Sequence, residues 1–310
     1  MIDVTAIGEA LIDLTQTGLS ASGIPEYAAN PGGAPANLAV AAAKLGASVS
    51  FIGRVGADAF GTQLRDCLRK NGVDVTRMIA DTQHPTTLAI VSVDQHGERS
   101  FAFYRQHSAD LALCAADVPD DALRNTRFFH FGGVSLTENP ARDTVLNAAA
   151  RARAFGACVT YDPNYRPALW DSREEALETL KRPLPLADIL KVSDEEMALL
   201  TGTDDLAAGS AALADFGIPL VLVTLGAKGA FYRFHGETGQ VDGVPCVVAD
   251  TNGAGDTFFG AFLSQLRASS LDTLTIPQLR EMLLFANRAA SLTTSRAGAI
   301  PAMPTLQELQ

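Results

Sequence analysis

The chain has few cysteines and no clustered histidines. Its 310 residues include four cysteines, Cys67, Cys114, Cys158 and Cys246, which lie far apart without the CxxC spacing of a zinc or redox site. The five histidines show no HxxxH or HxxE spacing, which argues against a metal hydrolase. We therefore expect these cysteines to be reduced thiols that serve as small apolar side chains in the cytoplasm.

Positive charge is also scarce. The sequence has 24 lysines and arginines against 35 aspartates and glutamates, a net charge of −11, and no basic cluster. Because nucleic-acid backbones are bound by clustered basic side chains, we expect no nucleic-acid partner. The N-terminus shows no basic region with an apolar signal core, and no apolar run is long enough to span a bilayer. These features predict a cytoplasmic protein without membrane association.

The common nucleotide-binding motifs are missing too. The sequence contains no GxxxxGK[ST] phosphate loop, no GxGxxG after its first apolar run, and none of the protein-kinase signatures. The missing dinucleotide fingerprint disfavours an NAD-dependent enzyme. A nucleotide that binds this chain must therefore use a different element.

Short β-branched runs alternate with runs rich in alanine and leucine. This alternation predicts an α/β fold with a mainly parallel sheet that is covered by helices on both faces. The predicted strands are Ile2–Ile7, Val49–Val55, Phe128–Phe131, Ala157–Tyr161, Ile189–Val192 and Leu220–Thr224. The predicted helices are Ala34–Leu45, Gly61–Asn71, Arg142–Phe155, Asp194–Thr201, Ala254–Ala268 and Gln278–Thr294.

Two stretches interrupt this alternation. Leu11–Tyr27 follows the first strand without an obvious helix, and Thr86–Tyr104 has the pattern of a β-hairpin with a turn at Asp94–Gly97. We expect these two excursions to pair with each other as a small lid or as an interface.

The segment Asp250-Thr-Asn-Gly-Ala-Gly-Asp256 leads directly into the amphipathic helix that begins at Ala254. Gly253 and Gly255 permit a tight turn and leave backbone amides uncovered. These amides and the positive helix end would form an anion site, with Asp256 beside it. A simple helix cap explains the residues about equally well. The helix end is expected to lower the pKa of Asp256, which phosphoryl transfer tolerates because the proton moves late.

Four further segments have a structural interpretation, and two of them, Asn30–Asn37 and Asp162–Pro167, also have a ligand-binding one. Asn30–Asn37 is a glycine-rich helix start, and Thr224–Gly229 is a strand–turn–strand unit. The prolines in Asp162–Pro167 predict an extended segment with Asp162, Asn164 and Arg166 on one face, at the ligand-binding edge of the sheet. Ser193 and Glu196 have the spacing of a capping box, which requires no function.

Two segments resemble the signatures of the ribokinase-like (PfkB-type) carbohydrate kinases: Gly32-Gly-Ala-Pro-Ala-Asn37 through Gly46, and Asp250–Asp256. The resemblance extends from Gly8 to Ala299. It implies a ribokinase-like fold, with a doubly wound, mainly parallel sheet and a small β-sheet lid. We expect residues 1–310 to form a single kinase domain, with lid segments at about 11–30 and 84–107.

The resemblance also implies roles for the residues of the signatures. Asp256 corresponds to the catalytic base, and the amides of Gly253, Ala254 and Gly255 correspond to the anion hole. Sugar hydroxyls are expected to contact Asp13, Gly32, Gly33 and Asn37. ATP is expected to contact Lys191, Thr224, Gly226, Lys228, Gly229, Gly253, Gly255 and Asn287.

Metal ions are implied at two places. Glu196 corresponds to a glutamate that acts on Mg²⁺ through water, although Ser193 replaces the asparagine of the family's motif. A monovalent cation, K⁺, is expected near Asp250, Asn252, Thr293, Arg296 and Gly298, where backbone carbonyls would supply the ligands.

Within the family, Phe103-Tyr-Arg105, Ser108-Ala-Asp110 and Asp162–Arg166 resemble segments of fructokinases. This resemblance adds Tyr104, Arg105, Asn164 and Arg166 to the sugar side. It implies the phosphorylation of fructose to fructose 6-phosphate by ATP, in a homodimer formed through the lid. A kinase for 2-keto-3-deoxygluconate, ribose or aminoimidazole riboside remains an alternative, and a non-catalytic sugar or nucleotide sensor is an alternative of another class.

Overall fold

The larger of two sheets forms the centre of the protein. The computed structural model describes residues 1–93 and 99–310, so the predicted turn at Asp94–Gly97 lies outside the described residues. The larger sheet has nine strands in the order β13-β12-β11-β10-β9-β8-β1-β4-β5. Its parallel part contains β1 (Ile2–Ile7), β4 (Val49–Gly56), β5 (Val73–Asp81), β8 (Thr126–Gly132), β9 (Cys158–Asp162), β10 (Ile189–Ser193) and β11 (Leu220–Thr224). The antiparallel strands β12 (Ala230–Phe234) and β13 (Glu237–Val241) form one edge.

Helices cover both faces of this sheet, as the alternation in the sequence predicts. One apolar core packs beneath α1 (Ala34–Lys44), α2 (Ala59–Lys70), α8 (Ala254–Leu266) and α9 (Ile276–Thr294), with the short α10 (Leu306–Leu309) at its margin. The other packs beneath α3 (Asp120–Arg124), α4 (Ala141–Ala154), α5 (Arg173–Lys181), α6 (Asp194–Thr201) and α7 (Leu206–Ala214). All predicted strands and helices are present, with small differences at their ends. None of the described helices is long and apolar enough to cross a membrane.

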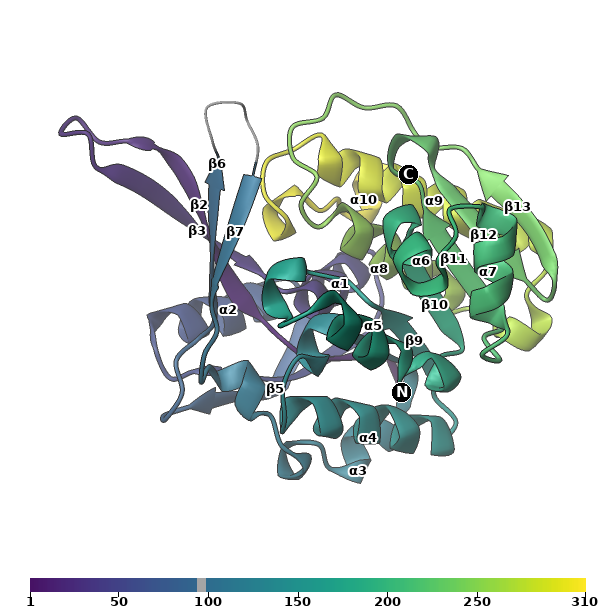
Figure 1. Ribbon diagram of the computed structural model, residues 1–310, viewed down its shortest axis with the longest axis horizontal. Helices are drawn as coiled ribbons and strands as arrows, with labels where there is room; N and C mark the ends of the chain where they lie inside the picture. Colours follow the sequence, from purple (N-terminus) through teal and green to yellow (C-terminus); the bar gives the residue numbers. More distant parts are fainter. Residues whose placement is uncertain (94–98) are drawn as a thin grey trace.

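The smaller sheet combines the two stretches that interrupt the alternation. It has the order β3-β2-β6-β7, with β2 at Leu11–Leu19, β3 at Pro25–Gly32, β6 at Leu88–Val93 and β7 at Arg99–Tyr104. The two hairpins join through parallel pairing of β2 with β6, where Ile12 lies opposite Leu88. Figure 1 shows this sheet extending away from the main body. The prediction that the two excursions pair with each other is confirmed.

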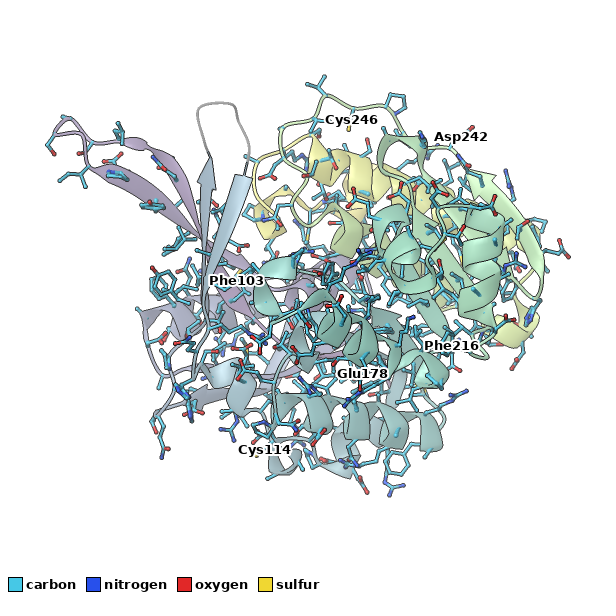
Figure 2. All side chains as sticks on the ribbon, in the orientation of Figure 1. Phe103, Cys114, Glu178, Phe216, Asp242 and Cys246 are labelled. Carbon is cyan, nitrogen blue, oxygen red and sulfur yellow. The ribbon has the colours of Figure 1, made fainter. Side chains whose placement is uncertain are left out.

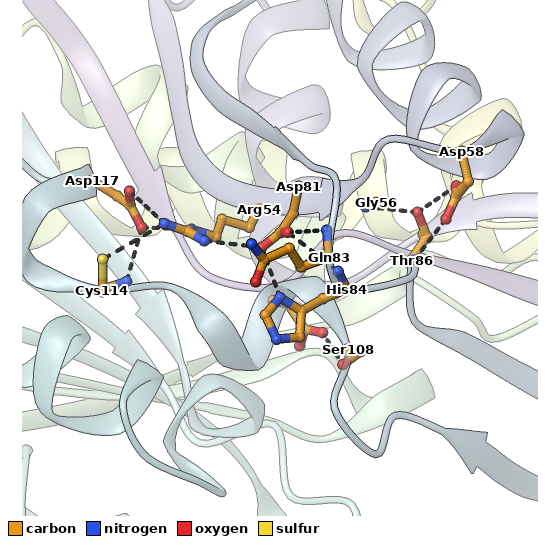
Figure 3. Close-up of polar contacts among 11 residues, drawn as sticks. Arg54, Gly56, Asp58, Asp81, Gln83, His84, Thr86, Ser108, Cys114 and Asp117 are labelled. Atoms are coloured by element: carbon orange, nitrogen blue, oxygen red, sulfur yellow. Dashed lines mark hydrogen bonds and ion pairs between the residues drawn. The ribbon is translucent and has the colours of Figure 1, made fainter.

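Buried and half-buried polar contacts fix the chain that enters the smaller sheet (Figure 3). Arg54 at the end of β4 forms ion pairs with Asp81 at 2.9 Å and with Asp117 at 2.7 Å. The carboxylate of Asp58 accepts hydrogen bonds from both the amide and the hydroxyl of Thr86, at 2.9 and 2.8 Å. The connection between β5 and β6 is therefore anchored to the main body at both of its ends.

Candidate active site

The carboxyl ends of the central strands meet at a cavity of about 700 Å³. The segments that follow β1, β9, β10 and β11 all contribute to its wall, as expected for an open parallel sheet. The smaller sheet adds side chains from β2 and β7, and the first turns of α1 and α8 complete the wall. The polar and charged residues that line it include Glu9, Asp13, Asn37, Asn164, Arg166, Lys191, Glu196 and Asp256.

Asp256 lies in the first turn of α8 and is 7% exposed. Its Oδ2 accepts a hydrogen bond from Nδ2 of Asn37 at 2.9 Å, and its Oδ1 accepts one from Nδ2 of Asn164 at 3.3 Å. The other amide atom of Asn37, Oδ1, is buried without a hydrogen-bond partner among the described residues. Asn37 therefore holds the carboxylate with one end and offers a buried acceptor at the other.

The predicted lowering of the pKa of Asp256 is wrong. Burial and the nearby charge of Asp162 raise this pKa from 3.8 to about 6, against the opposing effects of Asn37, Lys191 and Arg166. The helix end favours the ionised form, but the loss of water around the carboxylate outweighs it. The carboxylate is therefore a better proton acceptor than the sequence suggests, and it is still mainly ionised at neutral pH.

Lys191 places a positive charge beside this carboxylate. Its ammonium forms a buried ion pair with Asp162 at 2.9 Å. Burial opposes the charged form, but Asp162, Glu196 and Asp256 together raise the pKa of Lys191, so the ammonium stays protonated. A Cβ atom on Gly255 would come within 3.0 Å of the ammonium nitrogen. Glycine at position 255 thus lets the cation approach the start of α8 closely.

The start of α8 has the features of an anion site. Gly253 has a φ of 73°, a left-handed conformation that glycine adopts readily, and none of the described side chains caps the helix. A Cβ atom at this position would also approach Cβ of Ala299 to 2.8 Å. The amide of Ala254 donates to the carbonyl of Thr251 at 3.3 Å. The first-turn amides and the helix dipole together favour a negatively charged group here.

A second cavity, of about 530 Å³, adjoins the first at this helix end. Both cavities are lined by Thr224, Gly226, Thr251 and Gly255. The remaining wall of the second cavity is largely apolar and includes Val244, Pro245, Cys246, Val248, Phe258 and Ala290. Cys246 lies on the long loop after β13 (Figure 2). An apolar cavity that opens onto an anion site suits a flat ring system with a phosphate chain.

The residues predicted to contact the nucleotide are divided between these two cavities. Thr224 and Gly226 line both, Gly229 lines the second, and Lys191 lines the first. Asn287 also lines the second cavity, and its amide nitrogen donates to the carbonyls of Val241 and Asp242. Among the described lining residues, Lys228 is found in neither cavity. The predicted strand–turn–strand unit is present, with a turn of 3-10 helix at Gly226–Lys228.

Only some of the residues predicted to contact the sugar line the first cavity. Asp13, Gly33, Asn37, Asn164 and Arg166 line the first cavity. Burial raises the pKa of the Asp13 carboxyl to about 6. Gly32 lies beside this carboxyl, because a Cβ atom on it would come within 2.5 Å of Oδ2 of Asp13.

Tyr104 and Arg105 lie outside the described wall of that cavity, which contains Phe103 from the same strand. Tyr104 is 65% exposed. The guanidinium of Arg105 is buried and donates to Asp110 at 2.8 Å, Thr137 at 2.6 Å and the carbonyl of Val134 at 3.0 Å. Alternation along β7 explains why Phe103 and Tyr104 differ. The sugar-contacting role of Tyr104 and Arg105 stays a prediction.

The segment after β9 is not extended throughout, which corrects the prediction. Asn164 has a φ of 43°, and its amide donates to the carboxylate of Asp162 at 3.0 Å. This local hydrogen bond makes the turn possible, since asparagine tolerates the left-handed region better than most residues. Asn164 and Arg166 nevertheless line the cavity, whereas Asp162 is not among its described lining residues and forms an ion pair with Lys191.

The capping box at the start of α6 is confirmed, and the Glu196 carboxylate does more than cap the helix. One oxygen accepts from the amide of Ser193 at 2.8 Å, and the other accepts from the amide of Tyr165 at 2.7 Å. The side chain of Glu196 therefore joins the segment after β9 to the segment after β10. It also faces the first cavity.

Two of the residues predicted to surround a monovalent cation, Asn252 and Gly298, contact the Asp250 carboxylate. This carboxylate accepts from the amides of Asn252 at 2.9 Å and Gly298 at 3.1 Å. Thr293 is fully buried and donates to the hydroxyl of Thr257, and Arg296 forms an ion pair with Glu308. No group of three or more His, Cys, Asp or Glu side chains among the described residues has the arrangement of a metal site.

Glu9 lines the first cavity and has no predicted role. Glu9, directly after β1, is 1% exposed, and its carboxyl accepts from the amide of Ala34 and from the hydroxyl of Ser135. Burial raises the pKa of Glu9 to about 7. Its partners are 25 and 126 positions away in the sequence, so no local pattern could have revealed them.

The fold and the site define an α/β protein with two adjoining cavities at a helix N-terminus, and the buried carboxylate of Asp256 lines the first of them. Comparison with protein families identifies the class: the chain belongs to the pfkB family carbohydrate kinases, whose model matches residues 1–306. The resemblance of the two sequence signatures to this family is thereby confirmed.

Known members of the family resemble the chain over nearly its full length. A probable fructokinase-4 from Arabidopsis thaliana is 40% identical over 310 residues, which cover 99% of this chain and 95% of the relative. A fructokinase from Xylella fastidiosa with bound ATP has a TM-score of 0.92 and 34% identity, with 100% and 97% coverage. A double-mutant fructokinase from Vibrio cholerae O395, in its fructose-, ADP- and potassium-bound form, has a TM-score of 0.89 and 35% identity, with 99% and 96% coverage.

Proposed function

We propose that this chain is a fructokinase, which transfers the γ-phosphoryl group of ATP to a hydroxyl group of fructose. The observation that carries the proposal is the position of Asp256, which is buried at the start of α8 where the two cavities adjoin. The likeness to fructokinases in sequence and in structure supports the choice of sugar. Fructose would bind in the first cavity and the adenine ring in the second.

In this mechanism, Asp256 accepts the proton of the attacking sugar hydroxyl. The hydroxyl oxygen forms a bond to the γ-phosphorus before this proton is fully transferred, the bond from that phosphorus to the bridging oxygen breaks, and ADP leaves with the electron pair. Asn37 and Asn164 hold the Asp256 carboxylate by hydrogen bonds. The amides of Gly253, Ala254 and Gly255 would stabilise the charge on the transferring group, and the ammonium of Lys191 lies nearby to assist.

The resemblance implies Mg²⁺, and the residues present fit a hydrated ion carried by the nucleotide. Mg²⁺ in such sites keeps several waters and takes one or two carboxylates together with substrate phosphates. The Glu196 carboxylate faces the first cavity, and each of its oxygens accepts a backbone hydrogen bond with one of its two lone pairs, so acceptor capacity remains for bound water. The ion would neutralise phosphate charge, and Glu196 would hold its water shell.

We also propose K⁺ near the Asp250 carboxylate. This carboxylate accepts hydrogen bonds from the turn at Asn252, just before α8, and from the loop at Gly298, just after α9. Such an arrangement suits a cation held mainly by carbonyl oxygens beside the anion site. The related Vibrio cholerae fructokinase, whose bound form contains a potassium ion, supports this choice.

The smaller sheet is proposed to act as a lid within a single kinase domain of residues 1–310, with segments at about 11–30 and 84–107. Asp13 and Phe103 reach the first cavity from this sheet, so its movement would open or close the sugar site. Its exposed apolar residues, which include Leu19, Ile24 and Tyr104, suit pairing with a second copy of the chain. A cytoplasmic location is proposed on the basis of the free cysteines.

The proposed function is tested by measuring ADP release with Mg·ATP against fructose, ribose, 2-keto-3-deoxygluconate, glucose and aminoimidazole riboside. We expect fructose to give the highest kcat/KM. A clear preference for another sugar would overturn the substrate but not the chemistry. ADP release that is independent of every sugar would contradict a sugar kinase.

A further inference from the structure

Glu9 is a buried acid in the wall of the first cavity, and the proposed mechanism does not use it. Its Oε1 accepts from the amide of Ala34 at 3.2 Å, and its Oε2 accepts from the hydroxyl of Ser135 at 2.5 Å. The hydroxyl of Ser135 also accepts from the backbone amide of Glu9 at 3.3 Å. One side chain thus joins three segments of the cavity wall: the end of β1, the start of α1 and the turn after β8.

The contact with Ala34 supplies a cap that α1 lacks locally. The residue before this helix is Gly33, and none of the described side chains makes the usual capping hydrogen bond there. A negative charge at a helix N-terminus interacts favourably with the helix dipole. Glu9 therefore satisfies the first amide of α1 from a distant part of the sequence.

Close packing of the backbone also fixes the point where these three segments meet. Gly33 has a φ of 102°, and a Cβ atom on it would lie 2.6 Å from the carbonyl oxygen of Glu9. Gly8 is similarly constrained, because its Cβ atom would lie 2.3 Å from the hydroxyl oxygen of Ser135. The three segments therefore meet without room for a side chain at either glycine.

This junction lies one helical turn from Asn37, which holds the proposed base. The amide of Asn37 donates to the carbonyl of Gly33 at 2.8 Å, and the Asn37 side chain donates to Asp256 at 2.9 Å. The orientation of Asn37 consequently depends on where α1 begins. Glu9 holds that start against the sheet, so its effect reaches Asp256 through α1.

The burial of Glu9 disfavours the ionised form of its carboxyl group in the folded protein. Burial raises the pKa of its carboxyl to about 7, against the hydrogen bond from Ser135 and the charge of Arg105. A carboxyl group with this environment in a cavity wall is a candidate for a functional role.

We propose that Glu9 is a positioning residue for phosphoryl transfer: by holding the amide of Ala34 and the hydroxyl of Ser135, it fixes the start of α1 and thereby the Asn37–Asp256 pair. The proposal rests on the proposed function, because it assigns a task within that reaction. It does not depend on which sugar is phosphorylated.

The test compares Glu9→Ala, Glu9→Gln and Ser135→Ala with the parent protein, using the sugar of the panel that the parent turns over fastest. We expect Glu9→Ala to lower kcat by about ten- to a hundredfold through misplacement of the base, while the KM for ATP changes by less than about twofold. Glu9→Gln keeps an oxygen acceptor for Ala34 and should retain kcat within about threefold. Ser135→Ala should lower kcat several-fold, which keeps the proposal testable even if Glu9→Ala fails to fold.

Asp205→Ala is the matched control, because Asp205 caps α7 away from both cavities by accepting from the amide of Ala208 at 2.7 Å. We expect this variant to melt at a lower temperature with unchanged kcat and KM. A folded Glu9→Ala or Ser135→Ala protein with parental kcat would overturn the proposal. An equal loss in Glu9→Gln and Glu9→Ala would also overturn it. A parent that prefers another sugar would refute fructose as substrate without affecting this comparison.

Discussion

Replacing Asp256 with asparagine removes the proposed proton acceptor while nearly preserving the volume of the side chain. The loss of a general base typically lowers a rate by about 10²- to 10⁴-fold, which corresponds to about 3–5 kcal/mol of activation free energy. Because the cavity wall stays filled, we expect the KM for the sugar to change much less than kcat. ADP release in the presence of fructose measures both constants.

The same substitution should change how the stability of the folded protein depends on pH. The folded-state pKa of Asp256 is raised from 3.8 to about 6, so the folded state prefers the protonated form. The associated stability is fully present below the unfolded pKa and is lost as the pH rises through the folded pKa. A shift of roughly two units corresponds to about 3 kcal/mol. We therefore expect Asp256→Asn to raise the free energy of unfolding by roughly 1 kcal/mol more at pH 5, and by roughly 2 kcal/mol more at pH 8, than at pH 4. A pH-independent loss accompanies this change, because the amide nitrogen of the asparagine would face the amide nitrogen of Asn37 or Asn164.

Urea unfolding at these three pH values, together with the ADP assay, separates the two effects. The account requires a variant that is much slower than the parent and whose stability relative to the parent rises from pH 4 to pH 8. A variant that keeps near-normal turnover would refute the assignment of Asp256 as the base. A variant that is equally destabilised at every pH would refute the explanation of its raised pKa.

Three further predictions follow from the same geometry. The kcat/KM for the sugar should fall below about pH 6 as Asp256 becomes protonated. Asn37→Ala should move this fall to higher pH, because it removes a hydrogen bond to the carboxylate. A flat profile between pH 5 and pH 8 would contradict both statements. Lys191→Met should destabilise the protein by about 3–5 kcal/mol in urea unfolding, because it leaves Asp162 buried without its ion-pair partner; an unchanged midpoint would exclude this. A maleimide should label exposed Cys246 faster than the other cysteines. ATP should slow this labelling, because Cys246 lines the second cavity. Equal rates with and without ATP would argue against nucleotide binding there.

The sequence pattern predicted the central strands well because they are buried on both faces. Leu220–Thr224 and Ile189–Ser193 are short apolar runs, and the sheet places them side by side. The edge strand β5 gave no such signal, since buried and exposed residues alternate along Val73–Asp81. The short helices α5 and α7 were also not among the predicted elements. The parallel pairing of β2 with β6 depends on residues more than 70 positions apart, which no local pattern encodes.

The sequence pattern also revealed only the local features of the candidate site. The glycines and carboxylates of Asp250–Asp256 were visible as a possible anion site, since their effect comes from the local backbone. The pKa of Asp256 was predicted in the wrong direction, because burial and the charge of Asp162 arise only when the segment after β9 folds beside α8. Glu9 was missed for the same reason. Its two acceptor contacts come from α1 and from the turn after β8.

The central claim is that this site transfers a phosphoryl group from ATP to fructose with Asp256 as the base. Phosphorus NMR of a reaction that contains Mg·ATP and fructose tests it most directly, with the parent protein and Asp256→Asn compared at equal concentration. The account predicts that ADP and fructose 6-phosphate appear together in equal amounts with the parent and at least about a hundredfold more slowly with the variant. Inorganic phosphate in place of a sugar phosphate, or equal rates for the two proteins, would contradict it.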